Sequence, residues 1–207
     1  MNKTISLIGM ACATMLFSGL SMAQPAPGPM SFFVTSTGSG DGANLGGLAG
    51  ADAICQSRAE AAGAGDRTYR AYLSTQGPNA VNARDRIGAG PWYNAQGALI
   101  ANNVDDLHSM NHRLTAAAAI DENGNRIPGT GYSPNRHDIL TGSRPDGTAY
   151  PAGEDMTCNN WTSGDAGKAR IGHHDRANWN SAHDTQGCNQ QALINTGGDG
   201  LFYCFAL

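Results

Sequence analysis

Four cysteines constrain the fold of this chain more than any other feature of its sequence. Cys55 lies early, in a segment that predicts a helix, and Cys158, Cys188 and Cys204 lie in the last quarter. An even number of cysteines in a chain that reaches an oxidising compartment implies disulfides. Four cysteines allow three different pairings.

The N-terminal residues 1–23 predict a secretory signal. Lys3 supplies a short positive region, residues 5–20 are apolar, and Ser21-Met22-Ala23 is a small-x-small cleavage site. The alternative is a membrane anchor, which the short and interrupted apolar stretch disfavours because no stop-transfer pattern follows. We therefore expect a secreted or periplasmic protein without a membrane span after signal cleavage. Cys12 would leave with the signal.

Composition limits the classes of partner. Residues 24–30 form a proline-rich linker, and residues 31–207 have the length of one domain. The net charge is −4, only 14% of residues are charged, and the sequence has no basic cluster. We therefore expect no salt-sensitive binding to nucleic acid or to a heparin-like polyanion, because few cations are present to displace counterions.

The pattern of apolar residues predicts an α+β domain with one main helix and a mostly antiparallel sheet. Ala51, Cys55 and Ala59 recur at helical spacing, and Gly63 ends the segment. Residues 107–119 suit a helix or a tight strand equally, and 121–125 predict a turn. The expected elements are strands at 31–35, 68–74, 158–162 and 201–206, short extended pieces at 91–93, 98–101 and 139–142, and helices at 48–62 and 82–86.

An ordered series of motifs resembles the endostatin domain of collagens. The helix motif spans 45–55, and the strand Tyr69-Arg70-Ala71-Tyr72-Leu73-Ser74 follows it. The run 139–147 is similar to a loop of that family, and Cys158-x-x-Trp161-Thr162 and Tyr203-Cys204 are similar to its last two cysteine segments. The resemblance extends over residues 31–207 in the same order.

The resemblance implies a C-type lectin-like fold with long loops and two nested disulfides. Cys55 would pair with Cys204 on the outside, and Cys158 with Cys188 on the inside. The segments 179–183 and 200–205 also resemble the ends of bacterial secreted proteins loosely described as lectins.

The known ligands of these families do not carry over to this chain. Endostatin binds heparin through surface arginines and zinc through a histidine-bearing N-terminal arm, whereas residues 24–30 contain no histidine. Calcium-dependent lectins use carboxylate-bearing triplets, and Ser133-Pro134-Asn135 and Trp179-Asn180-Ser181 lack the carboxylate that a hard cation needs. The resemblance therefore implies a fold and leaves the ligand open.

One polar segment of the sequence is the candidate ligand site. Its imidazole, amide and carboxylate groups suit hydroxyl-rich ligands, and Trp179 or Trp161 would stack on a sugar ring unless it packs in the core. The alternatives are a hydrogen-bonded loop between strands and a zinc or copper site. Since no tight ligand spacing is present, we expect no metal and no cofactor. The candidate residues are His173, His174, Asp175, Asn178, Trp179, Asn180, His183 and Asp184.

Other polar residues carry weaker signals. The pair His137-Asp138 and the residues His108 and His112 read as isolated surface groups, and Asp52 reads as a local hydrogen-bonding group. The acidic turn at 121–125 does not match a calcium loop, because its twelfth position is Tyr132. No serine elbow, cysteine–histidine dyad or phosphate loop is present, so we expect no enzyme activity.

Three functions remain open from the sequence. The first is a non-catalytic extracytoplasmic binding module for a glycan or a cell-envelope component. The second is a structural or adhesive protein that is stabilised by its disulfides and has no small ligand. The third is a metal-assisted hydrolase that uses the segment from His173 to Asp184.

Overall fold

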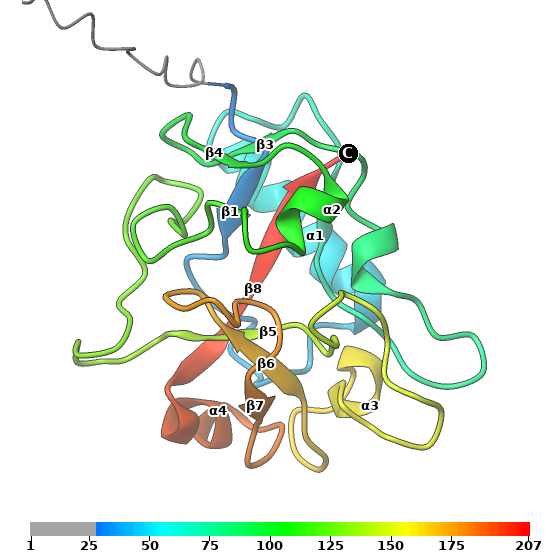
Figure 1. Ribbon diagram of the computed structural model, residues 1–207. Coiled ribbons are helices and arrows are strands. Elements are labelled where there is room, and N and C mark those ends of the chain that lie inside the picture. Colours follow the sequence, from blue (N-terminus) through cyan, green and yellow to red (C-terminus); the bar gives the residue numbers. More distant parts are fainter. Residues whose placement is uncertain (1–27) are drawn as a thin grey trace, which may run out of the picture.

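The C-terminal strand lies at the centre of the fold. The computed structural model describes residues 28–207, and its main sheet contains six strands in the order β1-β8-β5-β6-β7, with β2 also paired to β8. β8 (Gly198–Ala206) pairs antiparallel with β1 (Phe32–Val34) and β2 (Tyr69–Ala71), and parallel with β5 (Asp138–Leu140). Figure 1 shows β8 running diagonally through the middle of the molecule.

Both faces of β8 are buried. Tyr203 and Phe205 belong to one apolar cluster, while Phe202 and Cys204, which alternate with them, belong to the other. Successive side chains of a strand point to opposite faces, so a strand covered on both sides needs an unbroken apolar run. This accounts for the continuous apolar sequence at the end of the chain.

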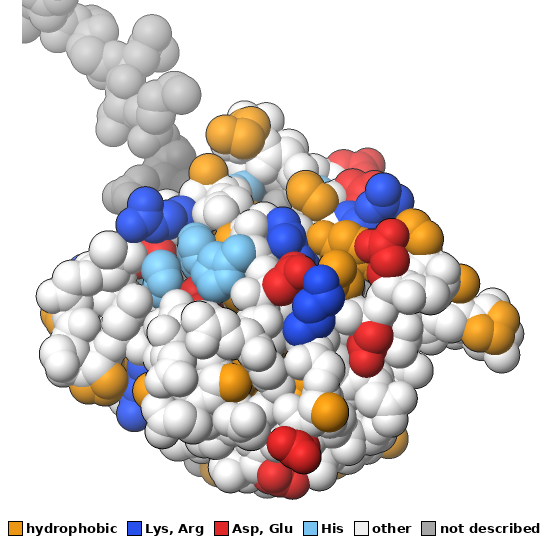
Figure 2. Space-filling view, turned by 90° about the horizontal axis from the view of Figure 1, so that it is seen from below, with side chains coloured by type: hydrophobic (Ala, Val, Ile, Leu, Met, Phe, Trp, Pro, Cys, Tyr) orange, Lys and Arg blue, Asp and Glu red, His pale blue; other side chains and the backbone are white. Residues whose placement is uncertain are grey.

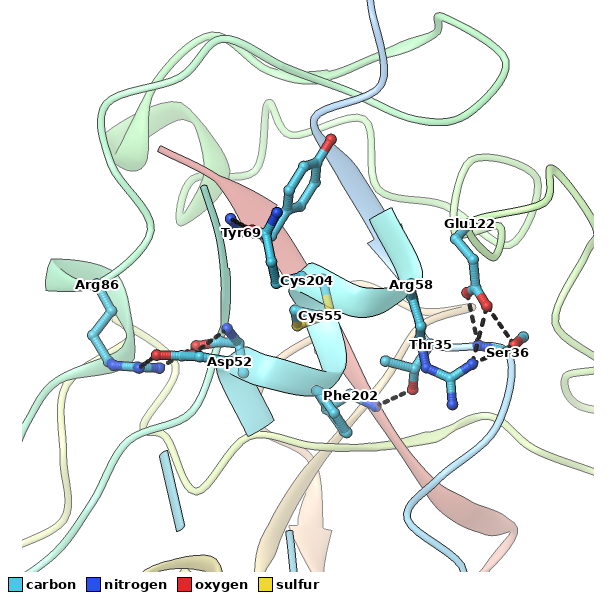
Figure 3. The surroundings of a disulfide bond; sticks show 12 residues. Thr35, Ser36, Asp52, Cys55, Arg58, Tyr69, Arg86, Glu122, Phe202 and Cys204 are labelled. Carbon is cyan, nitrogen blue, oxygen red and sulfur yellow. Dashed lines mark hydrogen bonds and ion pairs between the residues drawn. A yellow bond between two sulfur atoms is a disulfide. The ribbon is translucent and has the colours of Figure 1, made fainter. Parts of the chain in front are cut away.

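The first helix covers one of these faces. In α1 (Gly47–Ala61) the buried residues Ala51, Cys55 and Ala59 follow one another at four-residue spacing, as the sequence predicts. Asp52 on this helix accepts a hydrogen bond from the backbone N–H of Ala71 and pairs with Arg86 at 2.6 Å. Figure 3 shows this arrangement around the helix. Asp52 therefore binds groups distant in sequence and is not limited to local bonding.

Two disulfides connect the chain in the nested arrangement. Cys55 bonds to Cys204 across 149 residues, and Cys158 bonds to Cys188 across 30 residues. The outer bond joins α1 to β8, and Figure 3 shows it beneath the helix. All four cysteines are buried. The pairing that the family resemblance implies is confirmed, and it fits an oxidising compartment.

The strand predicted at 158–162 is wrong. Cys158–Trp161 forms α3, a single turn in which all four residues have positive φ, from 48° to 67°. Left-handed turns are unfavourable for residues other than glycine, so this turn depends on its surroundings. The hydroxyl of Thr157 accepts from the N–H of Asn160, and the indole of Trp161 donates to Ser74 O. The inner disulfide holds the turn from the other side.

The remaining elements follow the sequence in part. The predicted helix at 82–86 and the hairpin around residue 94 are present, whereas 107–119 forms turns after a short helix. The remaining elements are η1 (Ala83–Asp85), β3 (Trp92–Tyr93), β4 (Leu99–Ala101), α2 (Val104–Leu107), β6 (Arg170–His173), β7 (His183–Asp184) and α4 (Gln190–Thr196). Four of these, α2, β6, β7 and α4, were not predicted.

The structure confirms the α+β class, with helices, a mixed sheet and two disulfides. The predicted signal at 1–23 and residues 24–27 of the linker lie outside the described residues. Within residues 28–207, no helix is long and apolar enough to cross a membrane.

The two disulfides should differ in their contribution to stability. Replacing both Cys55 and Cys204 by alanine should lower the free energy of unfolding by up to about 5 kcal/mol, and replacing Cys158 and Cys188 by up to about 4 kcal/mol, because the longer loop loses more entropy when closed. Urea unfolding of the two double variants at one pH, with EDTA present, measures both losses. A greater loss from the inner pair would contradict this ranking.

Candidate metal centre

Strand register brings three polar side chains together at one end of the main sheet. Asp138 at the start of β5 lies opposite His173 at the end of β6, and Ile171 of β6 lies opposite His183 of β7. Residues 171 and 173 share one face of β6, so His183 and Asp138 reach the same face as His173. Figure 2 shows histidine side chains gathered on this side of the molecule, beside acidic and basic groups.

A fourth side chain joins the group from the residue just before β5. The pairing of β5 with β8 shifts register between Asp138 and Ile139, and the extra residues lie in β8, while β5 pairs regularly with β6. His137 lies against Asp138 and stacks on His173 with ring centroids 4.3 Å apart.

The three imidazoles converge on a single carboxylate oxygen. The distances from Asp138 Oδ1 are 3.1 Å to His137 Nε2, 3.3 Å to His173 Nε2 and 3.6 Å to His183 Nε2. One donor atom from each of His137, Asp138 and His173 lies within 4.8 Å of the other two. We call His137, Asp138, His173 and His183 together the His–Asp centre.

Asp138 is buried and poorly supplied with hydrogen-bond donors. It is 3% exposed, and neither of its carboxylate oxygens has a hydrogen-bond partner of good geometry within residues 28–207. Burial raises the pKa of this carboxyl group, although the Thr196 side chain is near enough to lower this pKa in part. The ring nitrogens of His173 are also buried and have no such partner in the described part of the chain. Buried polar groups in proteins are normally paired, so this cluster requires an explanation.

Hydrogen bonds behind the ring direct the Nε2 atoms of two histidines toward Asp138. His183 Nδ1 lies 3.0 Å from the backbone oxygen of Asp184, which can only accept, so Nδ1 carries the hydrogen. His137 Nδ1 lies 3.3 Å from Asp175 Oδ1 and 3.1 Å from the Thr130 hydroxyl. A ring without a hydrogen on Nε2 presents a lone pair to the carboxylate oxygen, and this repulsion is removed by a proton on Nε2 or by a metal cation between the atoms.

The spacing of the donor atoms suits a tetrahedral transition metal. Zinc binds histidine nitrogen and carboxylate oxygen at about 2.0–2.1 Å, which places neighbouring tetrahedral ligands about 3.3 Å apart. The separations of 3.1–3.6 Å from Asp138 Oδ1 to the three Nε2 atoms lie around this value. The donors that all lie within 4.8 Å of one another are those of His137, Asp138 and His173, without His183. Calcium prefers six to eight oxygen ligands, so three imidazoles argue against it. The donor set suits zinc, copper, nickel or cobalt.

The structure divides the candidate residues predicted from the sequence. His173 and His183 belong to the centre, and Asp175 bonds behind it. Trp179 packs in the core against Tyr72, with ring centroids 4.9 Å apart. Trp161 is also fully buried, so neither ring offers an open face to a sugar.

The side chains of Asn178, Asn180 and Asp184 do not contact the donor atoms of the centre. The buried Asn180 donates to the Tyr72 hydroxyl, while Asn178 is exposed and accepts from His173 N through its backbone oxygen. Asp184 pairs with Lys168 and Arg170. A groove of about 430 Å³ passes along the residues His108, His112, Asn178, Trp179, Asn180 and Ser181, among others.

Sequence analysis missed half of the centre. The interpretation of His137 and Asp138 as isolated surface groups is wrong, because Asp138 is buried and both contact His173. The available signal was a histidine-aspartate pair directly before the apolar residues Ile139 and Leu140. That signal identifies a polar strand end and does not identify its partner strand.

A cavity of about 170 Å³ adjoins the outer side of the centre, and we call it the Arg126 cavity. Asp175, which bonds to His137, forms part of its wall. Its neighbour His174 also lines the cavity and is fully buried, so it does not belong to a solvated loop. The complete lining is Ala116, Arg126, Ile127, Pro128, Gly129, Thr130, Tyr132, His174 and Asp175.

Comparison with known proteins gives no assignment. No protein-family model matches the chain, and no curated protein matches it in sequence. The functional argument therefore rests on the geometry of the described residues.

Acid should destabilise the metal-free protein. Burial lowers the pKa of His174 from its usual 6.5 to about 4, so below pH 6.5 the unfolded chain binds a proton that the folded chain does not. His174 contributes fully to the free energy of unfolding above pH 6.5. This contribution, on the order of 3 kcal/mol, is lost as the pH falls toward 4. Asp138 opposes this trend, because its raised pKa makes the folded state take up a proton first.

A matched variant isolates the contribution of the histidine. His174→Leu replaces a buried ring that has no hydrogen-bond partner at either nitrogen among the described residues. Urea unfolding with EDTA at pH 7, 5.5 and 4.5 should show a smaller loss of stability on acidification for the variant than for the wild type. Equal losses in the two proteins would show that His174 does not contribute.

Proposed function

We propose that this protein is a non-catalytic extracytoplasmic binding module whose ligand at the His–Asp centre is a divalent transition-metal ion. The α+β architecture and nested disulfides support a C-type lectin-like fold related to endostatin, which remains part of the proposal. The predicted signal supports export. A metal ligand differs from our expectation from the sequence, which was that no metal binds.

One observation supports the metal above all others. Three imidazole Nε2 atoms lie 3.1–3.6 Å from one buried carboxylate oxygen that accepts no hydrogen bond from the described residues. A divalent cation would accept all four lone pairs and compensate the buried charge of Asp138. A neutral His183 cannot donate to Asp138 through Nε2, because its Nδ1 already carries the hydrogen.

The number of ligands favours binding over catalysis. Structural zinc sites use four protein ligands, while catalytic sites keep one position for water or substrate. Donor atoms of His137, Asp138 and His173 lie within 4.8 Å of one another, and His183 would complete a tetrahedral shell by moving closer to them. With four protein ligands, a metal-assisted hydrolase is the less favoured function. The side chain of His183 is 41% exposed, so an ion can reach the centre from solvent.

We still predict that a glycan or a cell-envelope component is a second ligand of this protein. The structural alternative also remains, because a bound ion would join β5, β6 and β7 whatever the protein binds elsewhere. A structural ion would stabilise the fold without exchanging, whereas a transported or sensed ion would exchange with free metal.

Metal titration of the chelator-treated, full-length secreted protein tests the proposal. Isothermal titration with Zn²⁺ should give one site per chain. Asp138→Asn or His173→Ala should lower the zinc affinity more than about 100-fold, which exceeds the loss expected for a residue that only hydrogen-bonds to a metal ligand. Asp175→Asn should weaken it by roughly 10–100-fold, because Asp175 only orients His137. Bound zinc should also raise the melting temperature, since it binds the folded state alone.

The matched control for this titration is His112→Ala. His112 is a partly buried histidine next to Trp179 and outside the centre, so its loss should leave zinc affinity unchanged. Wild-type zinc affinity in Asp138→Asn and His173→Ala, or no zinc retained after dialysis of the wild type, would refute the proposed function.

A further inference from the structure

The Arg126 cavity has the size of one small ring. Its volume of about 170 Å³ equals that of about six water molecules in the liquid. Its lining includes the apolar residues Ala116, Ile127 and Pro128. Tyr132, which also lines it, is 64% exposed, although most large apolar side chains of the protein are buried. The apolar lining residues beside an exposed aromatic ring suit a ligand with a flat apolar ring.

A cation at the cavity has no protein partner. Arg126 lines the cavity and is exposed, and its guanidinium forms no ion pair or hydrogen bond with the residues from 28 to 207. Guanidinium groups pair best with carboxylates, through two parallel hydrogen bonds. The buried ring of His174 also lines the cavity and has no hydrogen-bond partner at either nitrogen within the described chain.

The cavity and the His–Asp centre share one residue. Asp175 forms part of the cavity wall, and its Oδ1 lies 3.3 Å from His137 Nδ1. Its Oδ2 accepts a hydrogen bond from the N–H of Thr130, another cavity residue, at 2.8 Å. An ion that orders His137 therefore also orders Asp175 and Thr130.

The charges of these groups predict whether a bound metal strengthens or weakens ligand binding in the cavity. Without metal, the carboxylate of Asp175 in the cavity wall and that of Asp138 behind His137 disfavour an anionic ligand, and Arg176, 3.9 Å from Asp175, offsets part of this charge. A divalent cation in the centre offsets both charges. An anion in the cavity should therefore bind more tightly once the metal is bound, and by reciprocity the anion should increase metal affinity.

We infer that the Arg126 cavity binds a small organic carboxylate with a flat apolar ring, and that metal in the His–Asp centre strengthens this binding. Arg126 pairs with the carboxylate, and Tyr132 packs against the ring. The coupling rests on the proposed metal function, while the ligand class rests on the cavity itself.

NMR titration with benzoate and its neutral isostere benzamide tests the inference. Benzoate should shift the amide signals of residues around 126–132 and 174–175, with an affinity at least about tenfold higher than that of benzamide, because only benzoate forms a charge-assisted pair. Saturation with Zn²⁺ should increase benzoate affinity by about fivefold or more and leave benzamide nearly unchanged.

Two variants separate the contributions to binding. Arg126→Gln should remove the preference for benzoate over benzamide, and Tyr132→Ala should weaken both probes. The control is Arg70→Gln, which removes another exposed arginine, on β2 and away from the cavity, and should change neither affinity.

Each other outcome counts against the inference. A stronger response to methyl glucoside than to benzoate would overturn the ligand class. No shift with any probe in protein shown to hold zinc would refute the cavity site and leave the proposed metal function intact. Benzoate binding that zinc does not enhance would refute the coupling. Failure to bind zinc would refute the proposed function, with the ligand class still decided by the metal-free titration.

Discussion

The pairing of β8 with three other strands is the interaction on which this structure depends. β1, β2 and β5 come from the beginning, the first half and the later half of the chain, and none of them pairs with another of the three. The disulfide between Cys55 and Cys204 joins the same strand to α1. Because β8 is buried on both faces, its loss would expose both apolar clusters at once.

The same pairing positions the proposed metal site. β8 holds β5, β5 holds β6, and β6 holds β7, so the three strands that carry the ligands form one ladder. His137, directly before β5, and Asp138, at its start, both contact this cluster. A buried carboxylate surrounded by neutral imidazoles is unfavourable by itself, and a divalent ion would remove this cost. Asp175 connects the centre to the Arg126 cavity, so the charge of an ion in the centre would also favour an anionic ligand in the cavity.

Sequence reasoning succeeded where local pattern determines structure. The spacing of Ala51, Cys55 and Ala59 predicts the buried face of α1, and the apolar run before Leu207 predicts β8. It failed where distant contacts decide. The left-handed turn at Cys158 is unfavourable by itself and is held by the disulfide and by hydrogen bonds from elsewhere. The meeting of Asp138 with His173 depends on register between strands 35 residues apart, which periodicity does not encode.

X-ray absorption spectroscopy of the zinc-loaded protein tests the central claim most directly, because it reports the atoms bound to the ion. The geometry predicts a first shell of three imidazole nitrogens and one oxygen at about 2.0–2.1 Å, without sulfur. The multiple-scattering signal of histidine should fall when His173 is replaced by alanine. A shell of oxygen atoms alone, or a histidine signal that His173→Ala leaves unchanged, would contradict the assignment of the His–Asp centre as the metal site.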